Sequence, residues 1–174
     1  MSVQPAAAAN PAVVVRTCAV LLEGRDVCLI HRVRPGGDQF SLPGGLLDPA
    51  EHVPEGLARE LREELGLDVA GLPEQPQLRW VQDQANTRPG REGIFRRLHL
   101  VHVLRVPPHV RQTVAATEQD AEDRNRVLWL DLEQAATLHL YPAVGSVLGS
   151  LAGPEDAPGP VLLPPITDRT FTWR

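Results

Sequence analysis

Three glutamates occur at spacings that would bring their side chains together on one side of a helix. Glu60, Glu63 and Glu64 belong to a stretch in which leucines recur every four residues. At about 100° per residue, Glu63 lies roughly 60° to one side of Glu60 and Glu64 roughly 40° to the other. The three carboxylates therefore share one stripe. The apolar residues form a second stripe beside it, which indicates the side that faces the core.

This arrangement is a poor choice for stability alone. Like charges one turn apart repel, and anions near the end of a helix are disfavoured by its dipole. Clustered carboxylate oxygens are, however, the ligands that hard cations such as Mg²⁺ and Mn²⁺ prefer. A solvated acidic face has the same pattern, so the residues around the three glutamates decide between the two interpretations.

Those residues complete a longer pattern. The stretch from Gly45 to Leu67 reads GLLDPAEHVPEGLARELREELGL. It resembles the Nudix box, G-x5-E-x7-R-E-U-x-E-E-x-G-U with U aliphatic, and every fixed position matches. The preceding LPGG at Leu42–Gly45 also resembles this family, and a looser similarity extends over residues 13–140.

The resemblance implies a metal-dependent hydrolase of the Nudix superfamily. Such an enzyme uses Mg²⁺ or Mn²⁺ to cleave the pyrophosphate bond of a nucleoside diphosphate linked to another group, X. The implied fold is α/β, an α/β/α sandwich with a mixed β-sheet in which the box forms a loop–helix–loop. The implied metal ligands are Glu60, Glu63, Glu64 and the carbonyl of Gly44, and the implied catalytic residues are Glu63, Glu64, Arg59 and Glu122.

Two of these roles need further explanation. Arg59 would pair with a neighbouring carboxylate and orient it. The base that takes a proton from the attacking water would be Glu63 or an acidic residue of the loop at 118–123. Glu122 is selected by its spacing from the following strand, with Glu118 and Asp123 as alternatives, although an acidic loop can also be simply solvated.

Substrate contacts are predicted on the other side of the cleft. Arg32 and Arg34 lie near the end of a predicted strand, where they can meet a phosphate or simply face solvent. Phe40 precedes the LPGG sequence, where it can wall the pocket or fill the core. We therefore expect Arg32, Arg34 and Phe40 to bind substrate.

The identity of X is left open. Family members specific for ADP-ribose or for dinucleoside polyphosphates often carry Pro or Tyr about fifteen or sixteen residues past the box, where this chain has Gln82 and Asp83. A nucleotide-sugar, a nucleoside di- or triphosphate and a capped RNA end all fit. The alternative functions are a non-catalytic Nudix-like module that senses a nucleotide or binds a partner, and an isoprenoid diphosphate isomerase. The isomerase would need a cysteine in its pocket, whereas Cys18 and Cys28 lie inside predicted strands.

The elements that position these residues are expected in an alternating order. A hairpin of strands at 13–22 and 27–33 is followed by a Gly/Pro loop at 34–41 and by a helix at 53–65 that ends at Gly66. The remaining strands are expected at 67–69, 78–82, 94–106 and 127–130, the loops at 83–93 and 107–126, and the helices at 131–138 and 142–151.

Composition is that of an ordinary globular protein. The 174 residues are 43 % hydrophobic and 22 % charged, and the net charge of −5 argues against a nucleic-acid binder. Lysine is absent, so all 17 basic residues are arginine. We expect the two cysteines to be buried thiols, as is usual in a cytoplasmic protein.

The chain divides into three parts. Residues 1–12 are expected to form a flexible lead-in, with the features of neither a signal peptide nor a membrane span. Residues 13–150 would form the Nudix domain, and residues 151–174 a Pro-rich extension. Phe171 and Trp173 would dock its tail on the same chain or across a homodimer. The expected partner is a small-molecule nucleotide, with no membrane partner.

Overall fold

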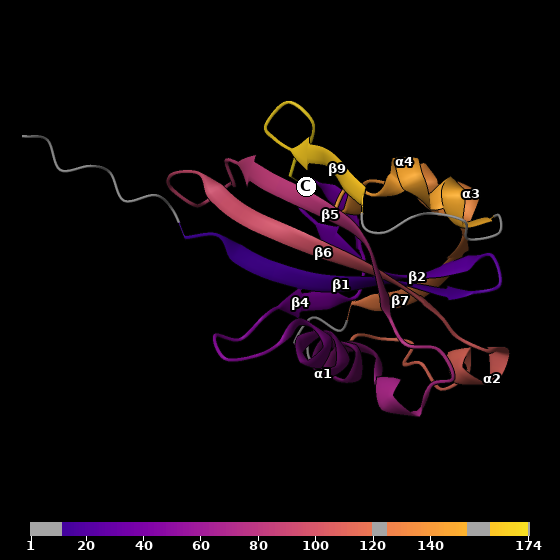
Figure 1. Ribbon diagram of the computed structural model, residues 1–174. Coiled ribbons are helices and arrows are strands. Elements are labelled where there is room, and N and C mark those ends of the chain that lie inside the picture. The colour runs from indigo at the N-terminus through magenta and orange to yellow at the C-terminus, as the bar shows by residue number, and fades with distance from the viewer. Residues whose placement is uncertain (1–11, 120–124, 153–160, 174) are drawn as a thin grey trace, which may run out of the picture.

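The computed structural model describes residues 12–119, 125–152 and 161–173. Within these ranges, nine strands form one mixed sheet in the order β8-β3-β2-β1-β6-β5-β9, with β4 paired to β1 and β7 to β2. The strands are β1 Val14–Glu23, β2 Asp26–Arg34, β3 Gly37–Ser41, β4 Gly44–Leu46, β5 Gln77–Asn86, β6 Phe95–Arg105, β7 Arg126–Asp131, β8 Leu140–Tyr141 and β9 Val161–Ile166. The α-helices are α1 Val53–Leu65, α2 Pro108–Arg111, α3 Leu132–Ala136 and α4 Gly145–Leu148. Helix α1 covers one face of the sheet, and α3 and α4 cover the other (Figure 1). The predicted sandwich is confirmed.

Strand β1 supplies both layers of the core. Because successive side chains of a strand point to opposite faces, Val20 and Leu22 enter the cluster that contains Leu132 of α3 and Leu148 of α4. Its other face carries residues such as Leu21, which pack on α1. The long apolar run at the start of the chain is therefore buried on both sides.

Helix α1 has the predicted bounds, Val53–Leu65. A glutamate in its first turn accepts a hydrogen bond from the backbone N–H of His52, at 3.1 Å. Gly66 ends the helix in the left-handed conformation, with φ of 69°. Leu57, Leu61 and Leu65 are all buried, so the apolar stripe faces the sheet as predicted.

Several predicted elements differ from the structure. The strand expected at 67–69 is absent, and a 3₁₀ turn at Val69–Gly71 follows α1 instead. Strand β5 continues to Asn86, past the predicted end at Gln82. Part of the loop expected at 34–41 is strand β3, and the helices expected at 131–138 and 142–151 are shorter.

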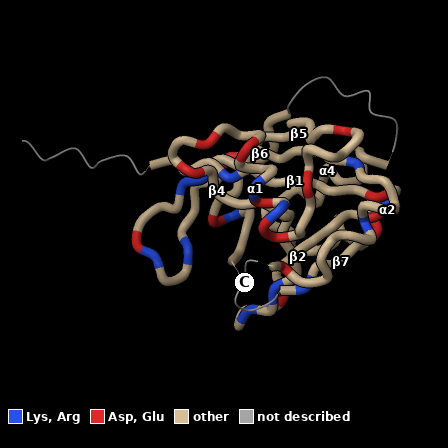
Figure 2. The backbone as a smooth tube through the Cα atoms, turned by 90° about the horizontal axis from the view of Figure 1, so that it is seen from below, with Lys and Arg blue, Asp and Glu red and all other residues tan. Residues whose placement is uncertain are grey.

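The C-terminal segment belongs to the same sheet. Strand β9 pairs in parallel with β5 at the edge, and the rings of Phe171 and Trp173 pack near Tyr141 of the same chain. None of the helices in the described ranges is both long and apolar enough to cross a membrane. Acidic and basic positions lie close together along α1 when the molecule is viewed from below (Figure 2).

Candidate active site

Strand β4 brings two glycines into contact with the acidic stripe of α1. The backbone N–H of Gly44 donates a hydrogen bond of 2.6 Å to Glu64 Oε2. Gly44 has φ of 129°, and a Cβ placed on it would lie 2.3 Å from the carbonyl oxygen of Thr17. A Cβ on Gly45 would lie 2.3 Å from the carboxyl group of Glu60. The close approach of the strands therefore requires glycine at Gly44, and a side chain at Gly45 would displace the carboxyl group of Glu60.

Two of the three stripe glutamates are buried. Glu60 is 9 % and Glu64 5 % exposed, whereas the side chain of Glu63 is 45 % exposed. Burial is the main cause that raises the pKa of Glu60, against the lowering effect of Arg59. Burial also raises the pKa of Glu64 to about 8, although Arg16 and the Gly44 N–H oppose the shift. The nearby positive charges therefore do not fully offset the effect of burial on the pKa values of Glu60 and Glu64.

Arg59 joins the carboxylates of the box. Its Nε and Nη2 donate to the two oxygens of Glu51 at 2.8 and 2.9 Å. Its Nη1 donates to Glu60 at 2.8 Å and to Glu63 at 3.0 Å. The hydrogen bonds from Arg59 are the main cause that lowers the pKa of Glu51. Arg59 thus orients three carboxylates, including one that sequence analysis did not assign to the site.

A second arginine approaches the stripe from β2. The guanidinium of Arg32 donates to Ser41 Oγ and to Glu118, and it lies 3.9 Å from Glu64 Oε1. Glu118 is buried, and Asn125 also donates to it. Of the acidic-loop candidates, the structure therefore brings Glu118 to the site, whereas Glu122 and Asp123 lie outside the described residues.

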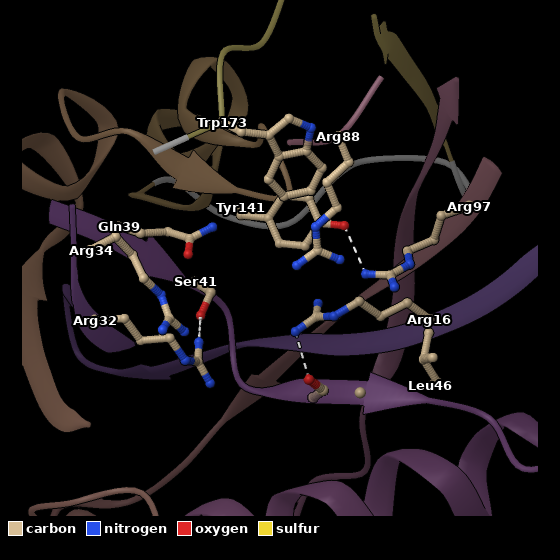
Figure 3. Close-up of a pocket in the computed structure, with 12 residues that line it drawn as sticks. Arg16, Arg32, Arg34, Gln39, Ser41, Leu46, Arg88, Arg97, Tyr141 and Trp173 are labelled. Carbon is tan, nitrogen blue, oxygen red and sulfur yellow. Dashed lines mark hydrogen bonds between the residues drawn. The ribbon is translucent and has the colours of Figure 1, made fainter. Parts of the chain in front are cut away.

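A cavity of about 270 Å³ adjoins the carboxylates, and both Gly44 and Gly45 line it (Figure 3). Arg32 and Arg34, which the sequence predicts to bind substrate, also line it. Phe40 does not. Its ring stacks on His31 with centroids 4.8 Å apart and packs against the core, which corresponds to the core-filling alternative.

Other residues of the cavity were not selected from the sequence. They are Arg16, Gln39, Ser41, Leu46, Arg88, Arg97, Tyr141 and Trp173. Arg16 offered a signal, because it is a lone charge inside an apolar strand and such a residue is seldom buried without a partner. Trp173 offered none, since its position depends on the pairing of β9 with a distant strand.

The donor types of the stripe fit a divalent cation. Glu60 and Glu64 are buried carboxylates with raised pKa values, so a nearby positive charge would stabilise their ionised forms. The described residues hold no group of three or more His, Cys, Asp or Glu already converging on one point. The carbonyl of Gly44 instead accepts a hydrogen bond from Arg16 at 2.5 Å. Metal binding at this carbonyl would therefore replace its contact with Arg16 by a contact with the ion.

Comparisons with known proteins identify the family and the fold of the chain. The NUDIX domain family model matches residues 12–147. None of the curated proteins matches the chain. The solved structures that resemble it include the MutT protein from Bacillus halodurans, with 14 % identity, TM-score 0.60, and coverage of 82 % of this chain and 84 % of that one.

Two further structures show the same fold. The Ap4A hydrolase of C. elegans, solved as a binary complex, has 18 % identity and TM-score 0.56, covering 80 % of this chain and 96 % of that one. The MutT NUDIX hydrolase from Burkholderia pseudomallei has 22 % identity and TM-score 0.51, covering 70 % and 84 %.

Proposed function

The chain belongs to the NUDIX domain family, and from this premise we propose that it is a hydrolase that cleaves a pyrophosphate bond of nucleoside diphosphate derivatives with the help of Mg²⁺ or Mn²⁺. The observation that carries the proposal is the hydrogen bond from Gly44 N–H to buried Glu64. It fixes a carboxylate with a raised pKa beside an arginine-lined cavity. A cation on one side and a phosphate on the other would satisfy both groups.

The residues that would hold the ion are Glu60, Glu63, Glu64 and the carbonyl of Gly44. Such an ion supplies positive charge that screens the diphosphate, and it lowers the pKa of an attacking water. The protein supplies orientation. Nη1 of Arg59 donates to both Glu60 and Glu63. Both carboxylates are therefore already oriented before the reaction begins.

Glu63 is the proposed general base. Its side chain is the most exposed of the three stripe glutamates, so it can reach a water molecule, and its hydrogen bond to Arg59 fixes one carboxylate oxygen. The carboxylate of Glu118 is already engaged by Arg32 and Asn125, and it is the alternative base. In-line attack on one phosphorus would expel a nucleoside monophosphate or a phosphorylated X.

The test is a substrate panel assayed with Mg²⁺, with Mn²⁺ and without metal. The panel contains a nucleoside triphosphate, a dinucleoside tetraphosphate, a nucleotide-sugar and ADP-ribose. We expect metal-dependent release of phosphorylated products by the wild type and a large loss in Glu64→Gln. Glu74→Gln is the matched control, because Glu74 is exposed and lies outside the box, which ends at Leu67.

The non-catalytic alternative makes a different prediction for the same panel. It has one observation in its favour, because Arg16 occupies the Gly44 carbonyl and the acids are bound to arginine. Tight nucleotide binding with no turnover in either metal would support a sensing module and contradict the enzymatic proposal.

A further inference from the structure

One cavity gathers an unusual share of the positive charge of this acidic protein. Five of its lining residues are arginines: Arg16, Arg32, Arg34, Arg88 and Arg97. The chain as a whole carries a net charge of −5. No aspartate or glutamate is among the described residues that line the cavity. Arg32 is paired with Glu118, which lies outside the lining. Guanidinium groups placed together repel one another, so the proximity of the five arginines still calls for an anion.

Two of these arginines carry buried nitrogen atoms that make no hydrogen bond within the part of the chain that the structure describes. Arg16 is only 7 % exposed, and its Nη2 donates to the carbonyls of Leu42 and Gly44. Among the described residues, its Nη1 has no hydrogen-bond partner, and neither has Nε of Arg97. Buried donors are nearly always satisfied in folded proteins. These two atoms are therefore available to a ligand that accepts hydrogen bonds.

The surroundings of Arg97 also disfavour its charged form. Burial lowers its pKa, and the nearby charges of Arg16 and Arg88 act in the same direction. The hydroxyl of Tyr141 accepts a hydrogen bond from Arg97 Nη1 at 2.8 Å and holds the side chain in place. A bound anion would offset the repulsion among these guanidinium groups.

The sheet register explains why the arginines meet. Strands β1 and β6 are parallel neighbours, and Arg16 lies opposite His99. Because side chains two residues apart share a face, Arg97 lies diagonally beside Arg16. Arg32 and Arg34 share one face of β2 for the same reason. The pairing of β1 with β6 therefore brings Arg16 and Arg97 together, and Arg32 and Arg34 line the same cavity from β2.

Arg88 is fixed by the C-terminal tail. The indole Nε1 of Trp173 donates to the carbonyl of Thr87 at 2.8 Å, and Asp168 accepts from both the N–H and the hydroxyl of Thr87 at 2.8 Å. The guanidinium of Arg88 lies 4.9 Å from the centre of the Trp173 ring. Figure 3 shows Arg88 beside Trp173 and facing the other arginines.

The cavity and the acidic stripe meet at the two glycines. Gly44 and Gly45 line the cavity, and the same residues contact Glu64 and Glu60. A pyrophosphate held at the carboxylates would thus extend its neighbouring group toward the arginines. The volume of about 270 Å³ is small for a whole nucleotide, but it suits a short chain of phosphates.

We propose that this arginine cavity binds phosphate groups of the substrate other than the two whose bond is cleaved. This inference rests on the proposed function and narrows its substrate class. Preferred substrates would carry at least one further phosphate, as nucleoside triphosphates and dinucleoside polyphosphates do. Nucleotide-sugars, whose X is neutral, would be poor substrates, because arginine forks bind phosphate oxygens and gain little from a sugar.

The first test measures binding without catalysis. Inorganic tripolyphosphate is titrated by calorimetry into the metal-free wild type, into R34Q/R88Q and into the control R25Q/R62Q. Arg34 and Arg88 are half-buried, so their replacement should leave the fold intact, as a thermal melt can verify. The control removes the same charge from surface arginines that pair with acids outside the cavity.

We expect the wild type and R25Q/R62Q to bind tripolyphosphate within about twofold of each other. R34Q/R88Q should bind at least about tenfold more weakly, because it loses two charge-assisted contacts. Equal binding by the wild type and R34Q/R88Q, or no binding by the wild type, would overturn the inference.

The second test compares two substrates with the same nucleosides. For the wild type with Mn²⁺, kcat/KM should be at least about tenfold higher for diadenosine tetraphosphate than for diadenosine diphosphate. In R34Q/R88Q that ratio should fall about fivefold or more. If both substrates lose activity equally, the cavity does not select extra phosphates, although the proposed hydrolase function stands. If neither is hydrolysed while the calorimetric difference persists, the anion site stands and the proposed function fails.

Discussion

The backbone N–H of Gly44 and the carboxylate of Glu64, twenty positions apart in the chain, are joined by a hydrogen bond of 2.6 Å. The bond links strand β4 to the last turn of helix α1, and the carboxylate that accepts it is buried. Ionisation of a carboxyl group buried in this way costs free energy unless a cation is near. This relationship gives two kinds of prediction, one for activity and one for stability.

Glu64→Gln should separate these two effects. The amide oxygen of glutamine can still accept from Gly44, so the fold should persist, whereas activity should fall roughly 100-fold or more because an ion ligand is lost.

The stability of the metal-free protein should change with pH in a defined direction. The folded pKa of Glu64 is raised to about 8 from 4.5, so between these values the folded state holds a proton that the unfolded state has released. The free energy of unfolding should therefore decrease as pH rises through this window, with a shallower slope in Glu64→Gln. Urea unfolding at several pH values measures it, and parallel slopes would contradict the assignment of the shift to Glu64.

Gly44→Ala should destabilise the protein more than a backbone effect alone explains. Both Gly44 and Gly24 have positive φ, but a Cβ on Gly24 meets nothing within 4 Å, whereas one on Gly44 lies 2.3 Å from the carbonyl oxygen of Thr17. We expect Gly24→Ala to cost about 1 kcal/mol, and Gly44→Ala roughly 3 kcal/mol or more. Chemical denaturation of the two variants gives the comparison. Equal losses would mean that β4 can move away from β1 at little cost.

Arg59→Lys should impair catalysis although the charge is kept. The guanidinium of Arg59 contacts three carboxylates at once and also donates to the carbonyl of Leu46. A lysine ammonium cannot reproduce this planar fork. We expect kcat to fall about tenfold or more, with KM changed less, because orientation of the acids is lost. Arg62→Lys, on an exposed position of the same helix, is the control and should retain activity.

Acid should destabilise the fold through a buried histidine. His99 is fully buried and hydrogen-bonded to Gln84, and burial lowers its pKa from 6.5 to about 2. As pH falls below 6.5, the unfolded chain binds a proton that the folded protein cannot accept. The free energy of unfolding should therefore fall by up to about 1.4 kcal/mol per pH unit for this group.

The matched variant is His99→Gln, which keeps a hydrogen-bond donor but cannot be protonated. Its unfolding free energy should depend less on pH between about 6.5 and 4.5. The dependence should not vanish, because burial also lowers the pKa of His102. Identical profiles for the two proteins would show that His99 does not carry the effect.

The local parts of the fold were predictable from the sequence, and the reasons are specific. Helix α1 has the predicted bounds because its apolar residues recur at helical spacing and Gly66 can adopt φ of 69°. The sequence predicts too early an end for strand β5, because the second half of the strand is polar. Gln82, Gln84 and Asn86 all point inward and are buried, stabilised by hydrogen bonds such as the one from Gln84 Nε2 to Asn86 Oδ1 at 2.9 Å.

The C-terminal strand was missed for a different reason. Its sequence VLLPPI contains two prolines, which normally indicate an extended linker. Strand β9 lies at the edge of the sheet, where missing N–H groups can be tolerated. Likewise, the carboxylate stripe follows from spacing within one helix. The arginine cavity combines distant strands, which local patterns do not bring together.

The tail that carries Trp173 lies beyond residues 12–147, the part of the chain that the family shares. One side of the cavity is thus made by a segment that the family model does not include, while the glutamates of α1 lie well within it. Sequence changes confined to the last dozen residues could remodel this wall and leave the hydrolytic centre untouched.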